Sequence, residues 1–424
     1  MKLRDLSREM KIMLLAMVIA NTAGAMIWPL MPLYLEYLGA SVQNIGFFFT
    51  AQVILGVCFR ILGGWISDHM GRLVTIAMGG MVGLVGHIAL AAAPSWEWTL
   101  ISALMGAIGS SLVGPSFQAY TAEQAPEGST SSTFGLVTAI YGICMIIGPV
   151  VGGLLADYLG YRALLWISAG IFVIAALLRI GTAYGKSWRV DELRPTELVS
   201  EIRGLVGLIF AGSGLLLWLF LVDGLSDASS QLALPFLPKF VTERGAISES
   251  GYGILVALMS LVGALAMVPG GMFADRFGER YSIAVGFVFA GGTWLLMVLY
   301  PGLIVFGIVF TLAGVAQAFI GPAFSSLVSK AVPKESLGIT WGIFWTALGV
   351  LAIPAPYIGG LLYDYVAPEA TFVVAAICSA LAIPLALRKL RLPAKEKRGD
   401  QSDQDDFDDD TRRVPVDVSA AQEI

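Results

Sequence analysis

Charged residues and potential metal ligands are scarce in this chain. Asp, Glu, Lys and Arg make up 13% of the 424 residues, against about a quarter in soluble globular proteins. The two histidines and three cysteines are scattered, without disulfide or metal-ligand spacing. These shortages argue against a zinc or haem centre, and no catalytic triad or nucleotide-binding loop is recognisable. We therefore expect a protein that is not an enzyme, holds no cofactor or metal, and does not bind nucleic acid.

Apolar residues, by contrast, make up 57% of the chain and gather in long runs. A run of roughly 20 apolar residues is long enough to cross a lipid bilayer. The runs fall at 11–36, 43–67, 73–93, 97–122, 132–157, 161–181, 213–241, 250–273, 281–300, 302–329, 338–363 and 368–388. The sequence therefore predicts an all-α polytopic membrane protein with twelve spans.

Positive charge is distributed unequally between the two sides of the membrane. If the spans alternate in direction, 22 of the 26 Lys and Arg residues lie on the side of the N-terminus, Arg179 among them. Loops rich in Lys and Arg remain in the cytoplasm. Both termini are therefore predicted to be cytoplasmic, in the plasma (inner) membrane of a prokaryotic-type cell.

The predicted spans divide the chain into four segments. Residues 1–181 form a six-helix bundle, and residues 213–390 form a second. Between them, 182–212 is predicted to be a cytoplasmic linker, either plain or with a short amphipathic helix on the membrane surface. The helical spacing that favours this helix involves Leu198, Val199, Ile202, Leu205 and Val206. The tail, 391–424, carries seven aspartates between 400 and 410 and is predicted to be disordered.

The two bundles repeat one another in sequence. Motifs centred on Asp68 and on Pro149 recur around Asp275 and Pro356, always 207 residues later. Near the start of each half, Pro29 recurs as Pro235 at an offset of 206. Because each half holds an even number of spans, the two copies run parallel and are related by an axis along the membrane normal.

At these motifs the chain resembles the major facilitator superfamily. The loop after the second span is similar to the family's G-x-x-x-D-[RK]-x-G-[RK]-[RK] signature, and a second degenerate copy follows the eighth span. The fifth span is similar to the signature of its 12-span drug:proton antiporters, although generic close helix packing is the alternative. The residues that match this signature include Gly148, Pro149, Gly152 and Gly153. One departure is Ser102, which stands where such antiporters usually carry an arginine in the fourth span.

The resemblance implies a gate of charged residues at the cytoplasmic ends of the spans. Asp68 would face the N-terminus of the eleventh span, whose helix dipole favours an anion. An Arg72–Glu123 ion pair is sterically plausible, and Asp68→Asn is expected to slow transport more than it weakens substrate affinity. The alternative is a basic loop that only fixes topology. The gate residues are Asp68, Arg72, Glu123, Asp275, Arg276 and Arg280.

A charge inside a membrane span is costly and therefore marks a functional candidate, and three residues are singled out on this ground: Arg60, Asp223 and Asp227. Asp223 and Asp227 lie one turn apart in the seventh span. A carboxylate that loses hydration binds a proton more readily, so Asp227 is the predicted proton carrier, with Asp223 as a second stop. The alternatives are that Asp227 only bonds a neighbouring helix and that Asp223 belongs to a gate. Asp227 is expected to face Asn21, its repeat-related position, across the two-fold axis. Arg60 either holds substrate or a carboxylate, or extends toward the cytoplasmic surface.

Uncharged polar and aromatic side chains complete the predicted cavity, which the resemblance assigns to spans one, four, seven and ten. For each of them, packing between helices is the alternative. His87, in the third span, is expected only to pack. The cavity candidates are Asn21, Trp28, Gln118, Gln231, Gln317 and Arg60.

These features together predict a monomeric secondary active transporter that works by alternating access. The favoured function is export of small amphipathic organic molecules, coupled to protons or, as an alternative, to Na⁺. One rival is a transporter of a sugar or another metabolite, although an anionic substrate would need basic cavity residues and Arg60 is the one available. A second rival is a membrane sensor or scaffold that does not transport.

Overall fold

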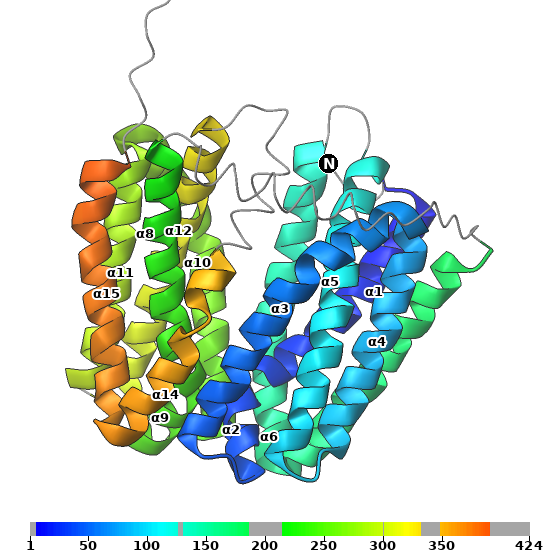
Figure 1. Cartoon of the computed structure of the whole chain (residues 1–424), viewed down its shortest axis with the longest axis horizontal. Helices are drawn as coiled ribbons and strands as arrows, with labels where there is room; N and C mark the ends of the chain where they lie inside the picture. Colours follow the sequence, from blue (N-terminus) through cyan, green and yellow to red (C-terminus); the bar gives the residue numbers. More distant parts are fainter. Residues whose placement is uncertain (1–5, 126–129, 186–213, 300, 332–347, 391–424) are drawn as a thin grey trace, which may run out of the picture. The chain divides into compact units, whose positions relative to one another are not determined.

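The computed structural model describes residues 6–125, 130–185, 214–299, 301–331 and 348–390. Most of the predicted linker 182–212, the acidic tail 391–424 and the beginning of the eleventh span lie outside the described residues. The amphipathic helix and the disordered tail therefore stay predictions. The chain from Met1 to Arg391 forms one compact unit, and its helices are shown in Figure 1.

The N-terminal half begins with a broken first span. α1 continues through the 3-10 turn η2 into α2, and Ser7 caps α1 by accepting a hydrogen bond from the Met10 N–H. α6 contains two spans because Gly160 adopts φ 81° and ψ 163°, a conformation that suits glycine and turns the chain. The elements are α1 (Arg8–Ile27), η2 (Trp28–Leu30), α2 (Met31–Tyr37), α3 (Val42–Met70), α4 (Arg72–Ala92), η3 (Trp96–Trp98), α5 (Thr99–Gln124) and α6 (Thr130–Ala183).

The C-terminal half repeats this order, including the broken first span. Pro29 and Pro235 occupy the equivalent 3-10 turns η2 and η4, where a residue without an N–H interrupts the α-helical hydrogen bonds. The elements are α8 (Gly214–Ala233), η4 (Leu234–Phe236), α9 (Leu237–Gly245), α10 (Glu249–Phe277), α11 (Glu279–Leu299), α12 (Leu303–Ala331), α14 (Ala355–Tyr365) and α15 (Pro368–Lys389).

The helices have the length and surface of membrane spans. In the described residues, nine helical stretches are long and apolar enough to cross a bilayer, and one of them, Thr133–Ala183, holds two predicted spans. Helices α8–α9 and α14 occupy the seventh and eleventh positions, so the structure is consistent with twelve. Large apolar side chains project outward at exposures that a soluble protein would bury. Examples are Leu177, Leu265, Val268, Met272 and Ile304.

Equivalent contacts hold each half together. A Cβ on Gly152 would overlap the carbonyl of Met26, and a Cβ on its repeat partner Gly359 would overlap the carbonyl of Leu232. A buried serine also bridges the equivalent pair of helices in each half, although the donor and acceptor helices are exchanged. Ser168 Oγ of α6 donates to Ala23 O of α1 at 3.0 Å, whereas Ser229 Oγ of α8 donates to Ala375 O of α15 at 2.9 Å. The repeat register found in the sequence is therefore also the register of packing.

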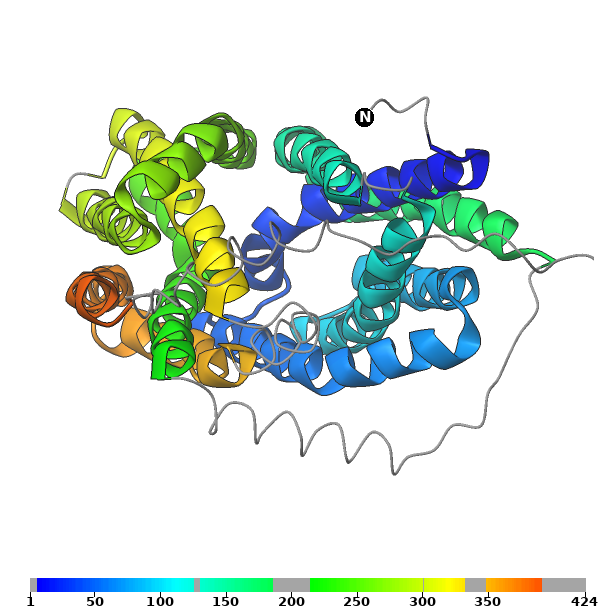
Figure 2. The same cartoon turned by 90° about the horizontal axis from the view of Figure 1, so that it is seen from above.

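The two halves also meet each other through equivalent contacts. Gly46 of α3 lies against the carbonyl of Pro356 in α14, and its repeat partner Gly253 of α10 lies against the carbonyl of Pro149 in α6. In Figure 2, which looks along the helices, the bundle of α1 to α6 lies beside the bundle of α8 to α15. Glycines at these crossings allow the backbones to approach closely.

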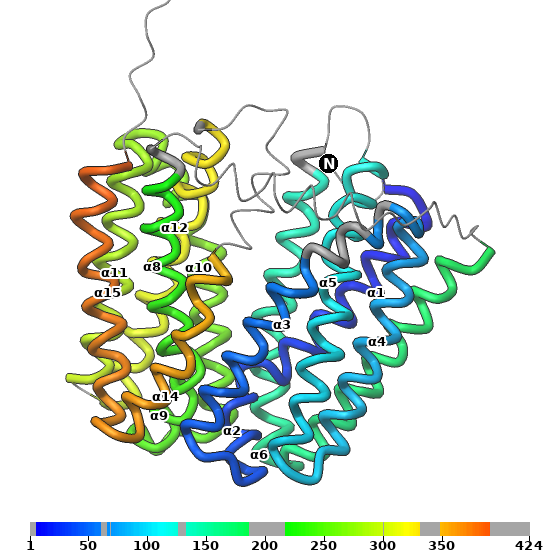
Figure 3. The backbone as a smooth tube through the Cα atoms, in the orientation of Figure 1, coloured from blue at the N-terminus to red at the C-terminus, as the bar shows by residue number. Residues whose placement is uncertain are grey.

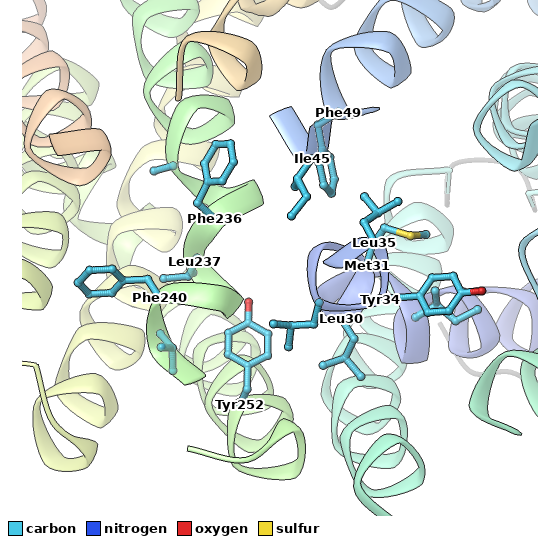
Figure 4. Close-up of a cluster of buried hydrophobic side chains, with 14 of the residues drawn as sticks. Leu30, Met31, Tyr34, Leu35, Ile45, Phe49, Phe236, Leu237, Phe240 and Tyr252 are labelled. Carbon is cyan, nitrogen blue, oxygen red and sulfur yellow. The ribbon is translucent and has the colours of Figure 1, made fainter. Parts of the chain in front are cut away.

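These contacts concentrate at the end of the helices opposite the N-terminus, where α2, α9 and α14 lie in Figures 1 and 3. Figure 4 shows apolar side chains of both halves gathered there, with Leu30 and Ile45 on one side and Phe236 and Tyr252 on the other. Burial of this cluster excludes water and stabilises the closure of the halves at this end.

Polar bonds between the halves reinforce the same end. Asp157 accepts hydrogen bonds from the backbone N–H groups of Glu249, at 3.1 Å, and Ser250, at 3.0 Å, at the beginning of α10. Its repeat partner Asp364 accepts one from Gln43 N at 3.3 Å, at the beginning of α3. A carboxylate at a helix N-terminus is favoured by the helix dipole. Each half thus caps a helix of the other.

Candidate substrate cavities and charged residues

One cavity lies inside the C-terminal half and has a volume of about 680 Å³. This volume falls in the usual range for small-molecule sites, roughly 300–1,000 Å³. Its walls are mostly apolar and include Met259 and Met267, whose flexible side chains can adapt to different shapes. Its polar lining groups include Asp223, Ser226, Ser229, Ser230 and Gln317. The predicted sites Asp223 and Gln317 are therefore brought together.

A second cavity, of about 290 Å³, lies inside the N-terminal half. It contains Asn21 and Trp28 from the predicted set, and also Arg179 and His87. Asn21 Nδ2 donates to the carbonyl of Met17 at 2.8 Å. His87 stacks on Phe172, with ring centroids 4.2 Å apart. His87 thus packs, as expected, but it also lines a cavity, which was not anticipated.

The remaining intramembrane charges lie across the interface between halves. Arg60 on α3 is exposed, and it lies within electrostatic range of Asp227 on α8, which is half-buried. Of the roles considered for Arg60, this position is compatible with an interaction with a carboxylate, which the C-terminal half supplies. Asp227 therefore has a basic neighbour in the N-terminal half, and its facing of Asn21 stays a prediction.

Three predicted cavity residues occupy different surroundings. Gln118 on α5 is exposed, and Gln231 near the end of α8 is half-buried; neither is among the side chains that line the two cavities. Trp28 is 51% exposed and meets Phe49 edge to face, with centroids 5.6 Å apart. Substrate contact by these three residues stays a prediction.

The loops at the N-terminal end carry an ion pair in each half. Arg72 Nε lies 3.1 Å from Glu123 Oε1, as the sequence suggested. The repeat-related positions hold Glu279 and Lys330, which also form an ion pair but with the charges exchanged. Both pairs join neighbouring helices within one half, α4 to α5 and α11 to α12. These two bonds therefore brace each half, and a gating role stays a prediction.

The other predicted gate residues make local contacts where they are described. The Asp275 side chain is exposed, and Arg276 lies over the ring of Phe277 at 5.3 Å. Arg280 lies over the ring of Tyr281 at 4.6 Å. The Asp68 side chain and the N-terminus of the eleventh span fall outside the described residues, so their predicted contact stays a prediction.

Arg179 requires a correction. It is one of the basic residues expected on the cytoplasmic side, but its side chain is 2% exposed and lies between helices of the N-terminal half. Removing it from the 22 leaves 21 of the 26 basic residues on that side, so the charge asymmetry persists. Its position two residues inside the predicted span 161–181 was the available signal for a buried charge.

The glycines of the antiporter-like motif lie where backbones cross. A Cβ on Gly148 would come within 2.9 Å of the Ala25 carbonyl carbon, and Gly152 lies against Met26, both in α1. Gly153 faces the other half, and a Cβ there would come within 2.8 Å of Ser250 Cα. The motif therefore brings α6 close both to its own half and to α10.

Two parallel six-helix repeats with a cavity in each define a class of membrane protein, the transporters built from pseudo-symmetric halves. The sequence matches the family model of the Major Facilitator Superfamily over residues 13–225 and 219–418. The chain therefore belongs to this superfamily.

Curated relatives cover most of the chain. It is 24% identical over 364 residues to the "Multi-drug resistance efflux pump PmrA homolog" of Lactococcus lactis subsp. lactis, covering 83% of this chain and 87% of that protein. It is 27% identical over 373 residues to the "Tetracycline resistance protein, class E" of Escherichia coli, with the same coverage.

Solved structures share the fold at low sequence identity. A POT family transporter in complex with 5-aminolevulinic acid is 14% identical with a TM-score of 0.73, covering 90% of this chain and 95% of that one. A bacterial homologue of the human lysosomal transporter Spinster, in an inward-facing and occupied conformation, is 14% identical with a TM-score of 0.72, covering 89% and 95%.

Proposed function

We propose that the chain is a secondary active transporter that exports small amphipathic organic molecules in exchange for protons. The observation that carries the proposal is the acidic, methionine-rich cavity of the C-terminal half, in which Asp223 is half-buried among apolar walls. A cationic substrate in this cavity would compete with the proton for the carboxylates of α8, with Asp227 as the carrier and Asp223 as a second stop, and this competition couples the two. Export is supported by the names of the curated relatives, two of which are a multi-drug efflux pump and a tetracycline resistance protein.

Alternating access supplies the transport step. The closure formed by α2, α9, α10 and α14 lies at the end opposite the N-terminus. With both termini in the cytoplasm of a plasma membrane, this closure is the outer gate. Opening it while the other end closes would present the cavities to the outside. The protein would then work as a monomer, since each chain contains both halves of the mechanism.

Asp227 is the proposed proton carrier, and its place near Arg60 supplies a way to sense the proton. When Asp227 is ionised it attracts Arg60 across the two halves, and when it binds a proton that attraction is lost. Protonation would therefore change the free energy of the state in which α3 and α8 are close. This is the electrostatic form of coupling that an exchanger requires.

The experiment compares wild type with Asp227→Asn, which mimics the protonated carboxyl. The purified full-length protein is reconstituted in vesicles, and uptake of a fluorescent cationic dye is followed under an imposed pH gradient. The variant should lose uphill accumulation yet retain dye exchange at equilibrium. Glu97→Gln, which changes an exposed carboxylate in η3 outside the two cavities and the predicted gate, is the matched control. Uphill transport by Asp227→Asn at the wild-type rate would sink the carrier role.

A further inference from the structure

Arg179 is a buried charge of the N-terminal half for which the described residues supply no counter-charge. Its side chain is 2% exposed, and within the described residues its Nε has no hydrogen-bond partner. Its Nη2 donates to Met17 Sδ at 3.2 Å, a weak acceptor, and its Cζ lies 5.7 Å from the ring of Phe172. A guanidinium keeps its charge in a protein, so a buried one normally has an anion beside it. This anion is the missing element.

The described side chains near Arg179 are polar but carry no negative charge. The Tyr141 hydroxyl is buried without a hydrogen-bond partner among the described residues, and it lies within electrostatic range of Arg179. His87 also lies within that range and lines the same cavity. The described cavity lining contains no Asp or Glu side chain. A buried positive charge that lines a cavity without a described carboxylate suits an anionic group.

The repeat supplies an independent comparison. Met17, which contacts Arg179, corresponds to Asp223 at the offset of 206, and Arg179 itself corresponds to Ala386 at the offset of 207. Asp223 lines the C-terminal cavity, whereas Ala386 is fully buried. At one equivalent pair of positions, the described part of the N-terminal half thus holds a cation without an anion, and that of the C-terminal half holds an anion without a cation.

We propose that the N-terminal cavity is an anion site, in which Arg179 binds the carboxylate of a small organic molecule. The apolar walls, among them Phe172 and Val113, would hold its body. A free inorganic anion such as chloride carries the same charge and could occupy the same site in place of an organic carboxylate. The inference goes beyond proton-coupled export, because it concerns equilibrium binding in one half and needs no gradient or transport direction.

The test uses the purified full-length protein in detergent and measures its thermal unfolding midpoint with added ligand. Sodium benzoate is the carboxylate probe and benzamide is its neutral counterpart of the same shape. Sodium chloride and sodium benzoate are compared at equal ionic strength, against sodium gluconate, whose anion is too hydrophilic for an apolar cavity. Benzoate should raise the midpoint by several degrees with saturation, and benzamide should not.

Two variants locate the site. Arg179→Gln removes the charge and should abolish the benzoate shift. Because that change alters a buried residue, Met17→Asp is the second variant, since it keeps Arg179 and supplies an internal carboxylate beside it. Met17→Asp should unfold at a higher temperature than wild type without ligand and should no longer respond to benzoate. Met17→Asn has the same shape without the charge, so it should still respond.

Each outcome decides the matter. A shift with benzoate beyond that with chloride, absent in Met17→Asp, supports an organic carboxylate site. An equal shift with both anions, also absent in Met17→Asp, supports the anion site and assigns it to a free inorganic ion. Equal shifts with benzamide and benzoate, an undiminished response in Met17→Asp, or no shift with any anion would overturn the proposal. None of these results depends on whether the protein exports by proton exchange.

Discussion

The two halves share their backbone contacts but differ in their charges. Gly152 against Met26 and Gly359 against Leu232 are the same crossing, made once in each half. At the loop ion pairs, however, Arg72 and Glu123 are replaced by Glu279 and Lys330 with the signs exchanged. A helix crossing without Cβ atoms tolerates almost no change, whereas an ion pair on a partly exposed surface can be reversed with little loss. Duplication has therefore preserved packing more strictly than electrostatics.

The cavities of the two halves also differ in charge. Arg179 gives the N-terminal cavity a positive charge, and Asp223 gives the C-terminal cavity a negative one. A symmetric scaffold thus encloses two unlike sites. Because opposite charges select opposite ligands, a substrate with one charged group would bind preferentially in one half.

The largest effect is expected where the halves are most alike. Gly152→Ala would place a Cβ within 2.8 Å of the Met26 carbonyl carbon, and Gly359→Ala would place one within 2.8 Å of Phe236 Cε2. Overpacking of a rigid crossing costs typically 1–3 kcal/mol and occasionally more, and we expect about 3 kcal/mol for each. Thermal unfolding of the purified protein measures the loss.

The matched control for both substitutions is Gly142→Ala, also in α6, where a new Cβ meets nothing within 4 Å. It should leave stability unchanged or slightly increased, by up to about 1 kcal/mol, since alanine favours helix more than glycine does. If Gly152→Ala unfolds like wild type while Gly359→Ala does not, the two crossings are not energetically equivalent.

A smaller and unequal effect is expected at the helix caps between halves. Asp157 accepts two backbone hydrogen bonds from α10, and Asp364 accepts one from α3. Asp157→Asn should therefore weaken the closed end more than Asp364→Asn does, by about 1–3 kcal/mol against about 1 kcal/mol. A tenfold change in population corresponds to about 1.4 kcal/mol, so the open state should become measurable.

Spin labels at Trp98→Cys and Tyr365→Cys, in a background without the three native cysteines, report the distance across this end. Both positions are exposed and lie in different halves. The long-distance population should increase most in Asp157→Asn. Glu97→Gln, whose carboxylate bonds Ser95 in the same half, is the control and should not change it. Equal long-distance populations in all variants would show that the two helix caps do not stabilise the closed end.

The smallest effect is expected from reversing a loop ion pair. The combined change Arg72→Glu and Glu123→Arg reproduces the arrangement that Glu279 and Lys330 already adopt. Such partly exposed pairs contribute about 0.2–1 kcal/mol, so the double variant should transport at nearly the wild-type rate, while each single variant is somewhat slower. A double variant as impaired as Arg72→Glu alone would mean that Arg72 acts through another partner, which includes its hydrogen bond to Ser67.

Much of the fold follows from residue pattern, because in a bilayer each span must satisfy its own backbone hydrogen bonds. The run 73–93 became α4 at Arg72–Ala92, and 368–388 became α15 at Pro368–Lys389. The repeat, and with it the family, could be identified from glycines, prolines and aspartates at a constant offset. The Arg72–Glu123 pair also followed, since both residues lie at the same end of adjacent spans.

The candidate sites were less accessible to sequence reasoning. Asp223 was predicted as a proton stop and Gln317 as a cavity residue, and the structure places both in the lining of one cavity, while their roles stay predictions. Arg179 and His87 were assigned to a loop and to packing, since sequence position does not reveal which way a side chain near a helix end points. The nearness of Arg60 to Asp227 depends on how α3 and α8 approach each other, and no local pattern encodes this.

Sequence alone determined the class of this protein, its span positions, its duplication and its charge asymmetry. These are one-dimensional properties, because hydropathy and repeat offset depend only on the order of residues along the chain. Tertiary structure decided which end of the helices is closed, which charges share a cavity and which remain without a counter-charge. Those properties depend on distances between residues such as Met17 and Arg179, 162 positions apart, that only the packing of helices brings into contact.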